Sequence, residues 1–132
     1  MATIFTKIIQ GEIPCYKIAE NDTHIAFLDI NPVAEGHSLV VPKKEVDYLF
    51  DLSDSHFAET MLFAKKIARA MDETLKPIRT GIILDGREVP HAHIHLVPIY
   101  KSTQSVSLGK KNDVSKERMK EIAKIISAGV KL

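Results

Sequence analysis

A run of alternating histidines constrains this chain more than any other feature. Residues 91–100 read HAHIHLVPIY, so histidine alternates with small or apolar residues over five positions. This pattern predicts a half-buried strand, because successive side chains of a strand point to opposite faces. We therefore expect His91, His93 and His95 on one face, where they are available for chemistry, and apolar residues packed into the core from the other face.

The spacing of these histidines suggests what they can bind. Along a strand, imidazoles two residues apart are separated by about 6.6 Å and the outer pair by about 13 Å. A row of this kind suits a charged ligand better than zinc, whose bonds to nitrogen are only about 2.0–2.1 Å long. Neutral imidazole can attack phosphorus, donate a hydrogen bond or carry a proton. We predict His93, the middle residue, as the nucleophile; a zinc site and a run of surface histidines are the alternatives.

The histidine run resembles the His-x-His-x-His-x-x motif of the histidine triad family of nucleotide hydrolases and transferases. Three upstream blocks resemble the same family: FTKIIQGEIP at residues 5–14, AFLDINP at 26–32 and GHSLVVPK at 36–43. Together the four blocks cover about residues 3–100. The resemblance implies an α+β fold, with a five-stranded antiparallel sheet, one long helix and shorter N- and C-terminal helices. It also implies a homodimer.

Site residues follow from the same resemblance. Asp29 is expected to bind the ribose hydroxyls, a task that suits a carboxylate because it accepts two hydrogen bonds from a cis diol. His95 is expected to donate to the phosphoryl oxygens, while His37 and His91 orient the nucleophilic ring. The expected walls of the base pocket are Phe5, Ile8 and Phe27, with backbone amides near Val89 available to the phosphate.

The loop before the triad departs from the family pattern. Gly86-Arg87-Glu88 stands where a Gly-Gln-Ser is expected, and the loop is several residues shorter. A carboxylate about 4 Å from a phosphate costs roughly 1 to 4 kcal/mol. Glu88 therefore points away, or Arg87 compensates its charge, or the substrate preference differs. Thr3 and Thr6 also replace a Cys-x-x-Cys that holds zinc in some relatives, so we expect no metal there.

The remaining elements follow from periodicity and from capping residues. Further strands are predicted over residues 15–19, 24–30, 36–42 and 80–84, after a short N-terminal helix stopped by Gly11. A long amphipathic helix should begin at the N-cap Ser53 and end at Pro77. A final helix should run from Ser115 to a stop at Gly129, after a mobile surface loop over residues 101–113. Short turns between neighbouring strands favour an antiparallel α+β arrangement.

Composition limits the number of domains and the classes of partner that we expect. With 132 residues, 45% of them hydrophobic, we expect one domain over residues 1–132, with its core in 3–100 and a C-terminal loop and helix in 101–132. A net charge of +1 implies no nucleic-acid or membrane partner. The single cysteine, Cys15, favours a reducing cytoplasmic location and a buried hydrophobic role. His24 and His56 are expected to face solvent, and no cofactor is expected.

The predicted function is hydrolysis or nucleotidyl transfer at the α-phosphate of purine nucleoside 5′-monophosphoryl conjugates, namely phosphoramidates or mixed anhydrides of AMP or GMP. The reaction would need no metal and would pass through a nucleotidyl-histidine intermediate on His93. Two alternatives stay open. One is a dinucleoside polyphosphate hydrolase, and the other is a nucleotide-binding protein with little turnover.

Overall fold

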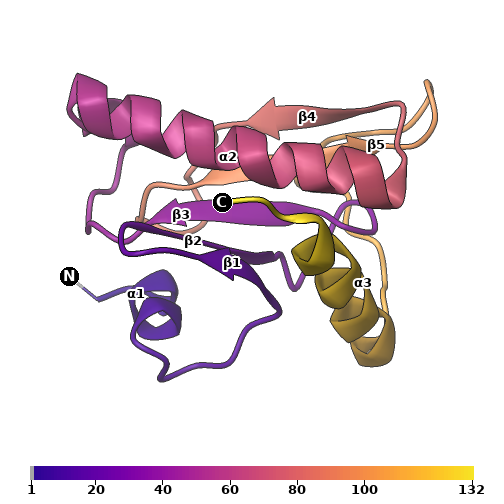
Figure 1. Ribbon diagram of the computed structural model, residues 1–132, viewed down its shortest axis with the longest axis horizontal. Helices are drawn as coiled ribbons and strands as arrows, with labels where there is room; N and C mark the ends of the chain where they lie inside the picture. The colour runs from indigo at the N-terminus through magenta and orange to yellow at the C-terminus, as the bar shows by residue number, and fades with distance from the viewer. Residues whose placement is uncertain (1) are drawn as a thin grey trace.

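A five-stranded antiparallel sheet organises the computed structural model, which describes residues 2–132 (Figure 1). The strands lie in the order β1-β2-β3-β5-β4, which confirms the predicted α+β class. The elements are, in chain order, α1 (Ile4–Ile9), β1 (Lys17–Glu20), β2 (His24–Leu28), β3 (Ser38–Pro42), the 3₁₀ helix η1 (Leu49–Asp51), α2 (Asp54–Leu75), β4 (Arg79–Ile83), β5 (Ile94–Ile99) and α3 (Lys116–Gly129).

Alternate residues of β2 separate two hydrophobic clusters on opposite faces of the sheet. Ala26 and Leu28 belong to the larger cluster, which α2 and α3 cover. Ile25 and Phe27 belong to the smaller cluster, where they pack with Phe5 of α1. Figure 1 shows α2 and α1 on opposite sides of the sheet. One face of the sheet is thus closed by long helices, and the other is left with only a short helix and loops over it.

The boundaries of α2 agree with the sequence prediction. The Ser53 hydroxyl caps the helix by accepting the N–H of His56 at 3.2 Å. At the other end, the C-cap Lys76 has a φ of 53°, in the left-handed region, directly before Pro77. Proline has no N–H to donate and excludes the helical conformation at the residue before it, so the helix must end there.

The two threonines of the N-terminal segment cap α1. The Thr3 hydroxyl accepts the N–H of Thr6 at 3.3 Å, and the Thr6 hydroxyl accepts the N–H of Thr3 at 3.2 Å. The Thr6 hydroxyl also donates to Glu45 at 2.9 Å. The helix then ends before Gly11, which has a φ of +79°. These threonines stabilise the helix that packs over the smaller hydrophobic cluster.

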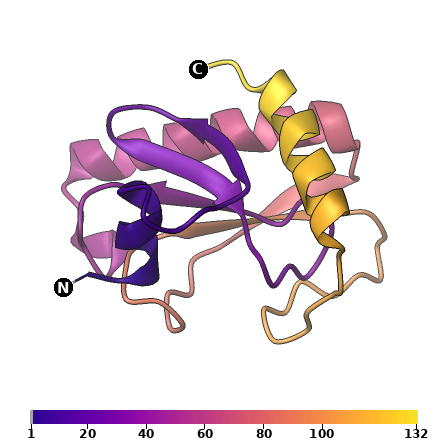
Figure 2. The same cartoon turned by 90° about the horizontal axis from the view of Figure 1, so that it is seen from below.

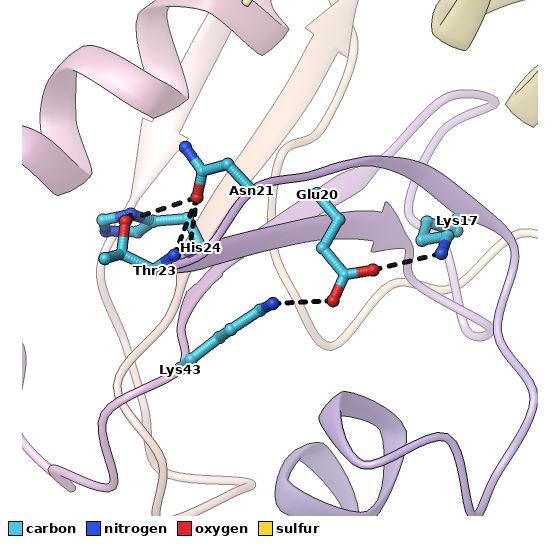
Figure 3. A network of polar contacts seen from close by, with 6 residues as sticks. All are labelled: Lys17, Glu20, Asn21, Thr23, His24 and Lys43. Atoms are coloured by element: carbon cyan, nitrogen blue, oxygen red, sulfur yellow. Dashed lines mark hydrogen bonds and ion pairs between the residues drawn. The ribbon is translucent and has the colours of Figure 1, made fainter.

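Polar contacts fix the hairpin between β1 and β2 (Figure 3). The Asn21 side-chain oxygen accepts the N–H of His24 at 2.8 Å, which closes the turn. Glu20 forms ion pairs with Lys17 at 3.1 Å and with Lys43 at 2.7 Å. The second pair connects the end of β1 to the residue after β3, so three neighbouring strands are held in register at this edge.

Two histidines predicted to face solvent do not. His24 is only 1% exposed, with Nδ1 2.9 Å from the Thr23 hydroxyl and Nε2 2.8 Å from the Thr60 hydroxyl. Its ring stacks on Phe63. The His56 ring lies 5.5 Å from that of His24, and its Nε2 is buried without a hydrogen-bond partner in the described chain. The prediction for His24 was wrong because α2 covers this face of β2, while His56, in the first turn of α2, is half-buried.

The start of one strand differs from the prediction. β5 begins at Ile94, so His91 and His93 precede the strand instead of lying within it. The last helix ends at Gly129, as predicted, and a Cβ at this glycine would come within 2.8 Å of the Thr74 side chain on α2. Within residues 2–132, no helix has both the length and the apolarity needed to cross a membrane.

Candidate functional site

An apolar cavity of about 180 Å³ lies between α1 and the open face of the sheet. It contains every residue predicted for the base, the ribose and the phosphate, together with two of the triad histidines. From that prediction, the lining includes Phe5, Ile8, Phe27, Asp29, Val89, His93 and His95. Residues from α1, the end of β2, the loop before β5 and β5 itself thus meet at one place, as the sequence analysis expected.

The His93 ring has one nitrogen occupied and one available. Its Nδ1 lies 2.6 Å from the carbonyl oxygen of His91, so Nδ1 carries the proton and donates it. Nε2 therefore keeps its lone pair. Burial lowers the pKa of His93, although the hydrogen bond to His91 acts in the opposite direction. The ring is 5% exposed and meets Phe5 edge to face, with ring centres 5.0 Å apart, so its orientation is fixed.

A chain of hydrogen bonds sets the tautomer of His95. The backbone N–H of Val33 donates to Nδ1 of His37 at 3.1 Å, so the ring proton of neutral His37 sits on Nε2. That Nε2 lies 2.9 Å from Nδ1 of His95, which must accept. His95 is consequently left with a proton on Nε2. Burial is the main cause that lowers the pKa of both His37 and His95 to about 4, so both rings are neutral at neutral pH.

His91 acts as an anchor and does not line the apolar cavity. It is 1% exposed, and its Nε2 donates to the carbonyl of Pro42 at 2.8 Å. This bond ties the segment before β5 to the end of β3 and aims the His91 carbonyl at His93. The expected row of equally spaced rings is therefore wrong: the centres of His93 and His95 are 4.9 Å apart, and His91 is held elsewhere.

Asp29 follows β2 directly and lies beside the histidines. One carboxylate oxygen accepts the N–H of Asn31 at 2.8 Å, and the other lies 3.6 Å from Nε2 of His37. Asp29, His37 and His95 could together hold a metal ion, because their ligand atoms lie within 4.8 Å of one another. Within residues 2–132 no other group of three or more His, Cys, Asp or Glu side chains does so. A metal ion there would have to replace the hydrogen bond between the two rings.

The loop between β4 and β5 settles one of the questions raised by its sequence. Arg87 pairs with Asp85 through contacts of 2.7 and 2.8 Å, and its side chain is 88% exposed. The guanidinium holds the pKa of Asp85 well below its usual range. Arg87 therefore forms its ion pair with Asp85 and none with Glu88, although the charges of Arg87 and Glu88 interact. Glu88 lines the apolar cavity together with His93 and His95.

A second cavity, of about 290 Å³, opens beside the same two histidines. Two of its lining residues, Leu108 and Gly109, were not predicted as site residues and belong to the segment expected to be a mobile surface loop. Asn112 anchors that segment: its N–H donates to Pro32 at 2.7 Å and its side-chain amide to Val33 at 3.0 Å. Figure 2 shows this segment and the loop between β4 and β5 extending on the same side of the molecule.

Comparisons with known proteins agree with this fold. The family model "HIT domain" matches residues 10–102. The chain is 33% identical over 133 residues to adenosine 5′-monophosphoramidase hnt1 of Schizosaccharomyces pombe, covering 99% of this chain and 100% of that protein. A HIT-like protein involved in cell-cycle regulation from Bartonella henselae superposes with a TM-score of 0.84 at 30% identity, covering 97% and 96% of the two chains.

A hypothetical histidine triad nucleotide-binding protein from Sulfolobus tokodaii superposes with a TM-score of 0.83 at 25% identity, over 96% of this chain and 90% of the other. The segment matched by the family model includes His37 and the three histidines of residues 91–95. This chain therefore belongs to the HIT, or histidine triad, family.

Proposed function

We propose that this protein is a phosphoramidase that releases purine nucleoside 5′-monophosphates from their conjugates with amines. One observation carries the proposal: the rings of His93, with a lone pair on Nε2, and of His95, with a proton on Nε2, have their centres 4.9 Å apart and both line the two cavities. A nucleophile beside a hydrogen-bond donor is what attack on a phosphoryl group requires. The similarity to an adenosine 5′-monophosphoramidase supports the choice of substrate.

The first cavity suits the nucleoside. Phe5, Ile8 and Phe27 offer apolar surfaces against which a flat purine can pack. Asp29 at the mouth of the histidine cluster can accept hydrogen bonds from the two ribose hydroxyls. These contacts would place the α-phosphorus next to His93.

The reaction then proceeds in two displacements. Nε2 of His93 forms a bond to phosphorus while the P–N bond breaks, and the leaving nitrogen takes the electron pair and a proton from water. In the second displacement a water molecule attacks phosphorus, Nε2 departs with its electron pair, and the water gives up its protons to solvent. His95 donates to a phosphoryl oxygen throughout. An alcohol or amine in place of water would turn hydrolysis into nucleotidyl transfer.

Apart from water and the substrate, both displacements use only groups of the protein. The negative charge on phosphorus is met by the N–H of His95, whose tautomer His37 fixes, and the nucleophile is held by His91. We therefore propose that turnover is independent of metal ions, so a chelator leaves the rate unchanged.

Cleavage of dinucleoside polyphosphates is the competing function. It would place further phosphate groups in the second cavity, where Asp85 is paired with Arg87 and Glu88 leaves one net negative charge. Repulsion between like charges disfavours that arrangement. We therefore propose amine conjugates as the better substrates.

The test is release of AMP from adenosine 5′-phosphoramidate and from diadenosine tetraphosphate, with and without a chelator. His93→Ala should lose turnover, and His56→Asn, which changes a histidine on the opposite face of the sheet, should keep it. Faster release from the dinucleotide would favour the competing function. Binding of AMP without release from either compound would identify a nucleotide-binding protein with little turnover.

We also propose that two copies associate through β4, which is an edge strand of the sheet. Large apolar side chains on and beside it are exposed: Ile78 at 60%, Ile82 at 50% and Leu84 at 38%. Tyr48 and Phe50 extend this surface and share a cavity with Leu84. An exposed apolar edge strand invites pairing, and a two-fold arrangement would join the two edges. Ile82→Lys should convert a dimer, measured by light scattering, into a monomer.

The single cysteine bears on the cellular compartment. Cys15 is the single cysteine and packs, half-buried, beside the Phe5 and Phe27 cluster. Burial raises the pKa of its thiol, so it is a poor nucleophile and behaves as a small apolar group. We propose the reducing cytoplasm as the location, which a fluorescent fusion would test.

A further inference from the structure

The two cavities divide a substrate between them, if the proposed function holds. Both are lined by Glu88, His93 and His95, so they meet where the phosphorus would lie. The first also holds Asp29 and the apolar walls that suit a nucleoside. The group attached on the other side of phosphorus would then occupy the second cavity, since the cavity beside Tyr48 and Phe50 contains His93 but not His95. The lining of that cavity therefore decides which leaving groups are accepted.

Glu88 gives the second cavity a net negative charge. Of its two acidic side chains, Asp85 is already paired with Arg87. Glu88 makes no hydrogen bond or ion pair within residues 2–132, although its charge acts on Arg87, which also lines the cavity. No lysine lines the cavity, but the charge of Lys111 acts on His95. The carboxylate is close enough to act on the nucleophile, since its charge opposes the lowering of the His93 pKa. The charged side chains that line the cavity, Asp85, Arg87 and Glu88, thus leave it with one net negative charge.

We propose that Glu88 determines specificity by selecting leaving groups with a positive charge. The substrate would be a nucleoside 5′-phosphoramidate of a diamine, or of another amine that carries a second, cationic group. A cation in the second cavity is attracted to Glu88, a neutral chain is not, and an anionic chain is repelled. Because Glu88 is exposed, its effect should be modest and should weaken with added salt.

The experiment compares three adenosine 5′-phosphoramidates that have side chains of nearly equal length. The putrescine conjugate ends in an ammonium group, the pentylamine conjugate in a methyl group and the γ-aminobutyrate conjugate in a carboxylate. The measured quantity is kcat/KM for AMP release, at low and at high salt. The wild-type protein should prefer the putrescine conjugate over the γ-aminobutyrate conjugate by on the order of tenfold at low salt.

Two variants isolate the carboxylate. Glu88→Gln keeps the size of the side chain and removes its charge, so the preference should fall toward unity. Glu73→Gln removes the same charge from α2, on the opposite face of the sheet, and should leave the preference unchanged. Each preference is a ratio of kcat/KM values for two conjugates measured on the same protein, so a general change in rate cancels, and thermal unfolding of each variant reports any loss of folding.

The outcomes distinguish this inference from the function on which it rests. Turnover of all three conjugates with no charge preference, or with a preference that survives in Glu88→Gln, overturns the role of Glu88 and leaves the phosphoramidase function standing. If no conjugate releases AMP, both the function and the inference are wrong.

Discussion

The hydrogen bonds that run from Val33 through His37 to His95 can be broken at their middle residue. His37→Leu removes the N–H that now holds Nδ1 of His95 as an acceptor at 2.9 Å. The His95 proton is then free to occupy either nitrogen, and the donor facing the phosphoryl group is present only part of the time. Loss of a residue that orients a catalytic group typically costs about 10- to 100-fold in activity. We expect that loss in kcat, with little change in KM.

The same substitution has a cost in stability that can be anticipated from the structure. His37 is fully buried, and its Nδ1 satisfies the N–H of Val33. An unpaired buried N–H costs about 1–3 kcal/mol in the free energy of unfolding. His37→Gln is the matched control, because its side-chain amide can donate toward His95 and accept from Val33. It should be more stable and more active than His37→Leu.

The assay is steady-state release of AMP from adenosine 5′-phosphoramidate, with the folded fraction of each variant determined by thermal unfolding at the same pH. Only rates of the folded protein are compared. A folded His37→Leu variant with the wild-type kcat would refute the reasoning. So would a His37→Gln variant that is folded but as slow as His37→Leu, since the hydrogen bond would then not be the cause.

Three further predictions test other parts of the site. Asp29→Asn should remove a preference for ribose over deoxyribose substrates, which we expect to be about tenfold in the wild-type kcat/KM; no such preference in the wild type would contradict the role of Asp29. His93 must be unprotonated to attack phosphorus, and burial lowers its pKa. The activity kcat/KM should therefore fall with decreasing pH only below the usual imidazole pKa of about 6.5. A fall that begins above that value would exclude His93 as the nucleophile. Burial, and then the charge of His56, lowers the pKa of His24. Its contribution to stability is thus complete above the unfolded value of about 6.5 and is lost as the pH falls through it. His24→Leu should accordingly show a smaller drop in Tm between about pH 7.5 and pH 5.5 than the wild type.

Local signals in the sequence were enough to predict much of the fold. Ser53 and Pro77 bound α2 for reasons that operate within a few residues, and the alternation of apolar residues in β2 and β5 reports which side chains enter the core. Asp29 and the predicted base-pocket residues, which were named from the resemblance of four sequence blocks, line the same cavity as His93.

Long-range packing explains what could not be predicted. His24 lies on a strand whose second face is covered by α2. No residue near His24 in the sequence indicates that a helix packs over it. His91 shares the spacing of the other triad residues, yet its partner is the carbonyl of Pro42, 49 residues away. The segment that carries Leu108 and Gly109 has no periodicity, and the Asn112 contacts that bring it to the site join distant parts of the chain.

The central claim is that phosphorus undergoes two successive displacements, the first by His93. Each in-line displacement inverts the configuration at phosphorus, so the stereochemical outcome counts the steps even when the intermediate does not accumulate. The measurement uses one diastereomer of an adenosine 5′-phosphoramidothioate, hydrolysed in oxygen-labelled water, with the configuration of the product determined by NMR. Net retention is the predicted result. Net inversion would mean that water attacks phosphorus directly, and would contradict a nucleotidyl-histidine intermediate.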